Sequence, residues 1–395
     1  MEDKTKENEK PKISYETLWK SVIRPTRDIY KIKDLGNPKF NFLNRTYTRK
    51  DYDLISSEGY IMKCSFYEPD PQFRPKKIMP VIIYLHGNSS SRLEGIGLLR
   101  EVLKRDINYF VFDFPGCGLS EGDFISLGFH ESRDLKTIID FIEKIPGVGA
   151  IGLWGRSMGA ATTMIYSHKD ERVKAIVMDS PFADFNILAK ELVLKQIKLP
   201  NFLIDGALKI VRSTIKKKNG LDIEKLKPID SAPKTKQPAI FIHAKSDELI
   251  NNNHSDMLYT TYGGKNKKII KCEGQHNTRR HYKIIREIGE FFYDHLVNQC
   301  QNNKNDNTNK EETDNIFKLD LNSIENSENK NSNENEKNEI NSSISTENSI
   351  DEKNTEQKKN EINSINNNEI KENKEELNKI IQNTEDKKDI KENIM

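Results

Sequence analysis

The residues Gly155-Arg156-Ser157-Met158-Gly159 place a serine midway between two glycines, in surroundings that give this spacing a chemical meaning. The mostly apolar run at 151–154 predicts a strand before the serine, and the helix-favouring residues at 160–165 predict a helix after it. A sharp reversal from strand to helix strains the central residue, commonly into a positive φ, and small flanking residues let the two elements approach. The hydroxyl of Ser157 would then lie where free helix N–H groups favour a developing oxyanion. A chance occurrence in a loop is the alternative, and the partners of Ser157 decide between the two.

A serine hydroxyl is a poor nucleophile at neutral pH, so it needs a base, and the base needs a carboxylate that fixes its tautomer. An apolar run at 238–244 and the segment Lys268-Ile269-Ile270-Lys271-Cys272 predict two more strands, which lead into Asp247 and His276. Because the carboxyl ends of parallel strands meet at one edge of a sheet, we expect Ser157, Asp247 and His276 to converge there. The sequence therefore predicts a nucleophile, an acid and a base in that order along the chain.

Two other residues compete for these roles. Asp179 follows the strand predicted beside that of Ser157 and could supply the carboxylate instead. His254 begins the helix predicted after Asp247 and could serve as the base. Five more histidines are predicted on or beside helices or within a strand, where they are poorly placed to reach the serine: His130, His168, His243, His281 and His295.

The negative charge of an acyl-transfer intermediate needs backbone N–H donors close to the nucleophile. The N–H of Met158 directly follows the serine. The apolar run at 80–85 ends in His86-Gly87, and the loop that follows leaves the carboxyl end of a predicted central strand. We therefore expect Met158 and one of Asn88 or Ser89 to form the oxyanion hole.

The elements that must position these residues alternate between strand and helix. Continuous apolar runs, typical of strands covered on both faces, occur at 80–85, 109–113 and 175–179. Helices are predicted between them at 93–103 and 132–145, and this alternation favours a mostly parallel sheet with right-handed crossovers. Strand-like pieces at 42–49 and 60–67 predict an antiparallel edge. The predicted fold class is α/β, with helices on both faces of a mostly parallel central sheet.

The chain of 395 residues divides into parts of different composition. We predict an N-terminal helical extension at 1–40, a catalytic domain at 41–300 and a disordered tail at 301–395. Within the domain, the apolar segment at 180–237 is longer than a minimal crossover and predicts a small helical cap over the site, or else helical cladding of the sheet. The tail is rich in Asn, Glu and Lys and has one aromatic residue, so it cannot bury enough apolar area to offset its chain entropy.

Charge and short motifs narrow the functional classes. The tail holds 14 Lys against 23 Asp and Glu, a net charge of −9; since the whole chain carries +2, residues 1–300 carry +11. Its basic residues are scattered apart from 216–218 and 265–271, so we expect no nucleic-acid partner. No P-loop, His-Glu-x-x-His or paired-Cys motif occurs, and the Gly116-x-Gly118 spacing does not continue as a dinucleotide loop, so we expect no cofactor and no metal.

The sequence also predicts a cytoplasmic protein. The charged N-terminus lacks the apolar core of a signal peptide, and no apolar stretch is long enough to span a bilayer. The four cysteines lie far apart, as expected of reduced thiols. Peripheral contact with a membrane is compatible with these features of the sequence.

With these motifs in place, the chain resembles the α/β-hydrolase superfamily, in particular its serine aminopeptidase-like and esterase/lipase-like branch, and is similar to uncharacterised plant and protist hydrolases. The matching segments, which together cover about 60–297, are Leu85-His86-Gly87-Asn88-Ser89, Asp113-Phe114-Pro115-Gly116-Cys117-Gly118-Leu119-Ser120, Gly152-Leu153-Trp154-Gly155-Arg156-Ser157-Met158-Gly159, Ile242-His243-Ala244-Lys245-Ser246-Asp247 and Gly274-Gln275-His276-Asn277. Arg279-Arg280 departs from the Arg-Pro that relatives often carry, which concerns the shape of the loop.

The resemblance implies an α/β-hydrolase fold and a Ser157–Asp247–His276 triad that forms an acyl-enzyme intermediate. The expected substrate is a carboxylic ester or thioester, and the apolar insert suggests a lipid or an acylated protein. An aminopeptidase-like enzyme is the nearest alternative; it needs an acidic pocket for a free amine, for which Asp184 and Glu191 are the candidates. A catalytically inactive scaffold that binds partners through its tail is the second alternative.

Overall fold

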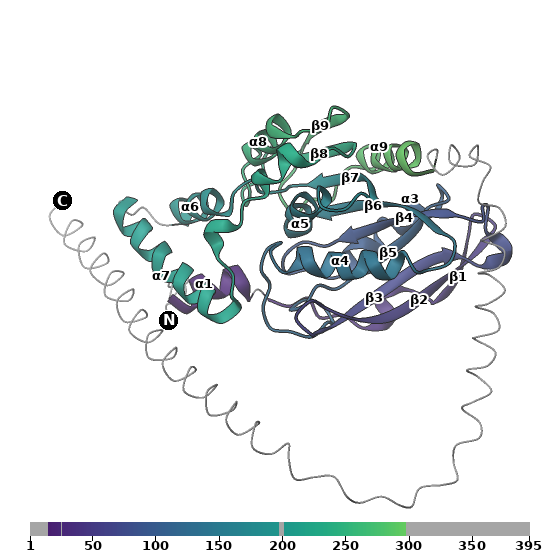
Figure 1. Ribbon diagram of the computed structural model, residues 1–395, viewed down its shortest axis with the longest axis horizontal. Helices are drawn as coiled ribbons and strands as arrows, with labels where there is room; N and C mark the ends of the chain where they lie inside the picture. Colours follow the sequence, from purple (N-terminus) through teal and green to yellow (C-terminus); the bar gives the residue numbers. More distant parts are fainter. Residues whose placement is uncertain (1–14, 25, 197–200, 298–395) are drawn as a thin grey trace, which may run out of the picture. The chain divides into compact units, whose positions relative to one another are not determined.

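A computed structural model of the chain describes residues 15–24, 26–196 and 201–297. The described strands form one nine-stranded sheet in the order β1-β2-β3-β5-β4-β6-β7-β8-β9 (Figure 1). Their bounds are Lys39–Phe42 (β1), Arg45–Ile55 (β2), Ile61–Pro69 (β3), Met79–Leu85 (β4), Asn108–Phe112 (β5), Val148–Arg156 (β6), Val173–Asp179 (β7), Ala239–Ala244 (β8) and Lys267–Cys272 (β9).

The two halves of the sheet differ in strand direction. β1, β2 and β3 pair antiparallel with one another, and β3 also pairs antiparallel with β5. From β5 to β9 every neighbouring pair is parallel. All seven residues of β4 and all five of β5 are buried, as expected of central strands that are covered on both faces. The predicted fold class, a mostly parallel central sheet with an antiparallel edge, is confirmed.

Helices cover both faces of this sheet. α3 (Leu99–Leu103) and α9 (Tyr282–Phe292) contribute to an apolar cluster that includes Trp154 of β6, whose ring centre lies 6.1 Å from that of Phe292. On the other face, a side chain at Gly155 would collide with Gly159 and Thr163 of α5 (Met158–Ser167). Because successive strand residues point to opposite faces, α5 lies on the face opposite α9. α4 (Glu131–Ile142) packs beside α5.

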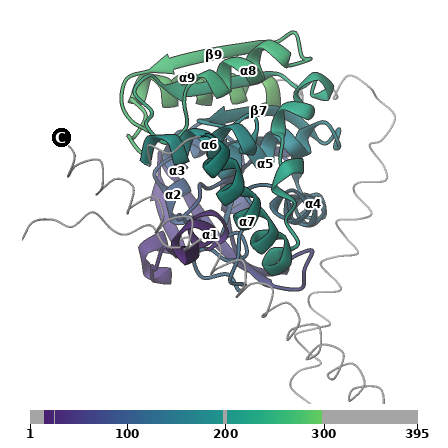
Figure 2. The same ribbon diagram turned by 90° about the vertical axis from the view of Figure 1, so that its left-hand side faces the viewer.

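The insert after β7 contains α6 (Phe185–Gln196) and α7 (Asn201–Asn219). Near the N-terminus, α1 (Tyr15–Ile23) packs against α7, and the Lys218 nitrogen lies 4.8 Å from the centre of the Trp19 ring. Figure 2 shows α1, α6 and α7 together on the side that faces the viewer. That this insert forms a cap over the site stays a prediction.

Two expectations differ from the structure or lie beyond it. The single helix predicted at 93–103 is two short helices, α2 (Leu93–Ile96) and α3, interrupted at Gly97-Leu98. The tail predicted at 301–395 lies outside the described residues, as do residues 1–14 of the N-terminal extension. Within the described part of the chain, no helix is both long enough and apolar enough to cross a bilayer.

Candidate active site

Ser157 lies at the turn between β6 and α5 and has the positive φ expected of a nucleophile elbow, 51°. The glycines on both sides are required by close packing. A side chain at Gly155 would collide with the backbone of Gly159, and one at Gly159 would collide with the carbonyl group of Leu85 in β4. The Ser157 N–H donates to the Asp179 carbonyl oxygen at 2.8 Å, which fixes the turn against β7. The spacing of the two glycines therefore reflects geometry that only glycine permits.

The structure brings Ser157, His276 and Asp247 together. His276 Nε2 lies 3.1 Å from Ser157 Oγ, and His276 Nδ1 lies 2.7 Å from Asp247 Oδ2. Asp247 follows β8 and His276 follows β9, so both groups leave the carboxyl ends of strands on the same side of β6. Ser157, Asp247 and His276 are only 9%, 8% and 6% exposed, so bulk water screens their interactions little.

The Asp247 carboxylate is surrounded by donors. Its Oδ1 accepts from the N–H groups of Leu249 at 2.9 Å and Ile250 at 2.8 Å, while His243 Nε2 lies 3.3 Å from Oδ2. Burial by itself raises the pKa of Asp247, but hydrogen bonds from His243 and His276 outweigh it and hold the pKa below its usual value. Asp247 is therefore an anion at neutral pH, as a carboxylate that stabilises an imidazolium must be.

The loop predicted to contribute to the oxyanion hole is held in place by His86. His86 Nδ1 donates to the Gly87 carbonyl oxygen at 2.8 Å, while Nε2 accepts from the Phe114 N–H at 3.1 Å. In a trans peptide the N–H points opposite the carbonyl group, so the Asn88 N–H points away from the His86 ring. In the described part of the chain, no residue accepts a hydrogen bond from the backbone N–H of Asn88 or Met158. Ser89 also has a positive φ, 57°, and its side chain is exposed.

Asp179, the alternative acid, is occupied elsewhere. Arg280 Nε lies 2.9 Å from Asp179 Oδ2 and Nη2 lies 2.7 Å from Oδ1, in a buried pair. Its carboxylate thus faces a guanidinium, and the imidazole of His276 instead contacts Asp247. Arg280, which sequence reasoning treated only as a change in loop shape, links the loop of His276 to the end of β7.

His254, the alternative base, also has other partners. Its Nδ1 accepts from the Ala183 N–H at 3.1 Å, and Nε2 lies 3.3 Å from Glu191 Oε2. Asp184, the second candidate for holding a substrate amine, accepts from the Asn186 N–H at 2.7 Å at the start of α6. Both carboxylates proposed for an amine pocket therefore have partners within the protein.

Two side chains beside the triad were missed by sequence reasoning. Arg156 Nη1 lies 2.7 Å from Glu94 Oε1, and Arg156 Nη2 donates to the His276 carbonyl oxygen at 3.1 Å. A charged residue between a buried strand and the nucleophile was the available signal for Arg156. No local signal identified Glu94, which lies 62 positions earlier in the chain.

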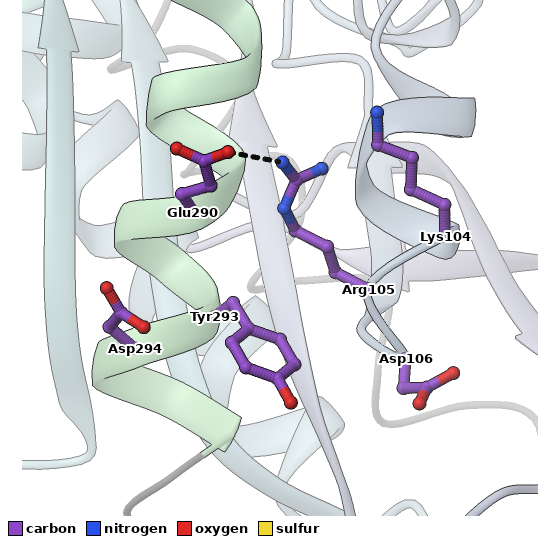
Figure 3. A pocket seen from close by; sticks show the side chains of 6 residues that line it. All are labelled: Lys104, Arg105, Asp106, Glu290, Tyr293 and Asp294. Carbon is purple, nitrogen blue, oxygen red and sulfur yellow. Dashed lines mark ion pairs between the residues drawn. The ribbon is translucent and has the colours of Figure 1, made fainter.

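Hollows elsewhere in the described part of the chain are not lined by Ser157, Asp247 or His276. One of about 560 Å³ lies between the α3 end and α9 (Figure 3), where Arg105 points toward Glu290. It includes Asp106, which precedes β5, so it opens at the amino ends of the parallel strands, opposite the triad. Among the residues that the structure describes, no cluster of His, Cys, Asp and Glu could hold a metal ion.

Comparisons with known proteins agree with this architecture. A family model described as alpha/beta hydrolase fold matches residues 80–203, which include Ser157. The chain is 27% identical over 244 residues to Bacillus subtilis YqkD (60% of this chain, 77% of YqkD). It is 26% identical over 248 residues to the Arabidopsis thaliana alpha/beta hydrolase domain-containing protein WAV2 (58% of this chain, 71% of WAV2). The solved structure of the Pyrococcus furiosus esterase PF2001 superposes with a TM-score of 0.53 at 19% identity, covering 69% of this chain and 97% of the esterase.

The chain is similar to members of the α/β-hydrolase superfamily, as the resemblance of its motifs implied: the family model matches residues 80–203, and WAV2 is a relative at 26% identity. It has the fold of that superfamily, in which the sheet presents catalytic loops at the carboxyl ends of its strands. The family and the fold support a hydrolase.

Proposed function

We propose that the protein is a serine hydrolase that cleaves carboxylic esters or thioesters through an acyl-Ser157 intermediate. The observation that carries the proposal is the continuous chain of contacts from Ser157 Oγ to His276 Nε2 at 3.1 Å and from His276 Nδ1 to Asp247 Oδ2 at 2.7 Å. Both distances lie within hydrogen-bond reach, and both side-chain partners of the imidazole are those that a proton transfer needs.

In the acylation step, His276 Nε2 takes the Ser157 proton while Oγ attacks the carbonyl carbon of the substrate. The N–H groups of Met158 and Asn88 receive the resulting oxyanion, and Asp247 stabilises the imidazolium. His276 then gives its proton to the leaving alkoxide or thiolate, and the C–O or C–S bond breaks. In deacylation, His276 takes a proton from water, the hydroxide attacks the acyl carbon, and the proton returns to Ser157 as the acid leaves.

The proposed substrate is a lipid or an acylated protein. Apolar side chains of the insert support it: Leu188, Leu208 and Val211 are buried within α6 and α7, whereas Leu194 and Ile187 are exposed. The exposed Ile187 and Leu194 suit contact with an acyl chain better than contact with a polar substrate. Peripheral contact with a membrane, where such substrates are found, is part of this proposal.

Labelling with a fluorophosphonate probe tests the proposal. The purified protein should be labelled, Ser157→Ala should abolish labelling, and His276→Asn should reduce it by a factor of about 10³ or more. Ser167→Ala is the matched control, because Ser167 lies in the same helix and donates to the Thr163 carbonyl oxygen at 2.7 Å. Labelling that persists in Ser157→Ala would refute the proposed nucleophile.

A substrate panel then separates ester from peptide chemistry. We expect turnover of p-nitrophenyl acyl esters and acyl thioesters and little turnover of aminoacyl p-nitroanilides, because Asp184 and Glu191 are both paired. Preferential cleavage of the anilides would favour the aminopeptidase instead. An unlabelled protein with no turnover of any panel member would favour the binding scaffold.

A further inference from the structure

The backbone of His276 is held by two guanidinium groups. Its carbonyl oxygen accepts from Arg156 Nη2 at 3.1 Å and from Arg280 Nη2 at 3.5 Å. Arg156 Nη2 also donates to Asn277 Oδ1 at 2.8 Å. The position of the imidazole depends on the loop that carries it. His276 must lie within hydrogen-bond distance of Ser157 and Asp247 at the same time. These contacts to the backbone of the loop therefore bear directly on the catalytic geometry.

Arg156 is itself anchored by Glu94. The two side chains are mostly buried, and Nη1 of the arginine lies 2.7 Å from Oε1 of the glutamate. Burial tends to raise the pKa of Glu94, yet the charge of Arg156 and a hydrogen bond from Ser90 hold it below its usual value. Glu94 also accepts from the Tyr84 hydroxyl at 2.8 Å and from the Gly87 N–H at 3.2 Å. The carboxylate thus contacts the loop that carries the Asn88 N–H.

The pair joins three separate catalytic segments. Arg156 is the last residue of β6 and precedes the nucleophile, so its backbone is fixed by the sheet. One arm of its guanidinium reaches Glu94 beside the oxyanion loop, and the other reaches the loop of His276. The planar fork of arginine serves two partners in fixed directions, whereas a lysine ammonium is a single point charge.

We propose that Arg156, anchored by Glu94, is a positioning residue that holds the His276 loop in register with Ser157 and the oxyanion loop. This inference rests on the proposed serine hydrolase function. Arg280, anchored by Asp179, supports the same loop from the neighbouring strand β7. The arginine acts through the His276 backbone and does not touch the reacting atoms.

The test compares Arg156→Met and Arg156→Lys with Arg172→Met in steady-state hydrolysis of a p-nitrophenyl ester. Arg172 is the matched control because it is also partly buried and paired, with Asp140, Asp170 and Glu143, but precedes β7 at the opposite edge of the sheet. We expect Arg156→Met to lower kcat by about 10²-fold with KM changed less than about threefold, since displacement of a catalytic group costs rate rather than binding.

Arg156→Lys separates positioning from stability. Lysine keeps the charge that Glu94 needs, so thermal unfolding should stay near that of the native protein, while kcat should still fall by about 10-fold because the second arm is lost. Glu94→Gln keeps an oxygen that can accept from the Gly87 N–H, so adding it to Arg156→Met should slow hydrolysis less than adding it to the native protein, since the two residues share one contact.

Two results overturn the inference. One is a kcat within about threefold of the native value for both Arg156 variants. The other is a loss of activity in Arg156→Met that only follows its unfolded fraction, as in Arg172→Met. Failure of the proposed function looks different, because the native protein itself would then be neither labelled at Ser157 nor active.

Discussion

Two buried carboxylates, Asp247 after β8 and Asp134 in α4, differ in pKa although both are largely shielded from water. Asp247 is 8% exposed and Asp134 is 2% exposed. Burial raises the pKa of Asp134 to about 6, and the nearby Glu131 and Glu58 act in the same direction. The pKa of Asp247 is instead held below its usual value.

The donors account for the difference. Oδ1 of Asp134 accepts from the N–H of Ser57 at 2.8 Å and from its hydroxyl at 2.7 Å, so both donors are neutral and come from one residue. Asp247 accepts from two backbone N–H groups and faces two histidine rings. Burial raises the pKa of a carboxyl group because it disfavours the charged form. The hydrogen-bond donors around the carboxylate decide whether its pKa is nevertheless held low. The donors around Asp247 keep its pKa low, whereas the two neutral donors of Ser57 do not do so for Asp134.

Removing the charge of Asp247 should have the largest effect. Asp247→Asn keeps the shape but presents an amide to His276 Nδ1, which favours the wrong tautomer of the base, so kcat should fall by about 10²–10⁴-fold. Ester hydrolysis by the variant, measured with thermal unfolding as the control for folding, checks this. A kcat within tenfold of the native value would mean that another carboxylate serves His276.

A smaller effect is expected from the second histidine that faces Asp247. His243 Nε2 lies 2.9 Å from the Ile250 carbonyl oxygen and 3.3 Å from Asp247 Oδ2, so it carries a proton, and Nδ1 accepts from the Ser255 hydroxyl at 2.6 Å. His243→Leu removes this donor, and we expect kcat to fall by about 10-fold.

His243→Gln is the matched variant, because its amide can place a donor near the position of Nε2. Its kcat should lie between those of the native protein and His243→Leu. Equal losses in both variants, in proportion to their loss of thermal stability, would show that His243 only fills space.

Local patterns in the sequence were sufficient to predict the parallel sheet and the close approach of Ser157, Asp247 and His276. Continuous apolar runs marked β4, β5 and β7, and the paired glycines around Ser157 marked the elbow, because each signal depends on neighbouring residues. The convergence of Asp247 and His276 followed from the rule that parallel strands end at one edge. The sheet topology thus brings Asp247 and His276, which are distant in the sequence, close to Ser157.

Contacts between distant side chains could not be predicted in the same way. Asp179 satisfies the edge rule as well as Asp247 does, but Arg280, 101 positions later, pairs with it. Ser57, which holds Asp134, lies 77 positions away on the turn between β2 and β3. The close packing of α2 against the sheet also depends on distant residues, since a side chain at Gly95 would collide with Tyr84 and Val111. Nothing in the local sequence specifies these partners.

The smallest effect is expected at Asp134 and concerns stability. Because its pKa is about 6 in the folded protein against 3.8 ordinarily, the folded state binds more protons than the unfolded state between about pH 4 and 6. Its contribution therefore falls as pH rises through that window, and the folded protein carries an unfavourable charge above it. Asp134→Asn keeps an acceptor for Ser57 and removes this charge, so it should stabilise the protein at pH 8 by on the order of 1–3 kcal/mol, with little gain at pH 4.

Chemical unfolding of Asp134→Asn and the native protein at pH 4, 6 and 8 measures this difference. Asp140→Asn, in the same helix, is the control: the hydrogen bond from Lys136 lowers the pKa of Asp140, so removing its charge should give no gain at pH 8. A gain for Asp134→Asn that is equal at all three pH values would mean that the carboxyl does not titrate in this window. The contrast with Asp247 would then lie in geometry alone, because burial would not have raised the pKa of Asp134.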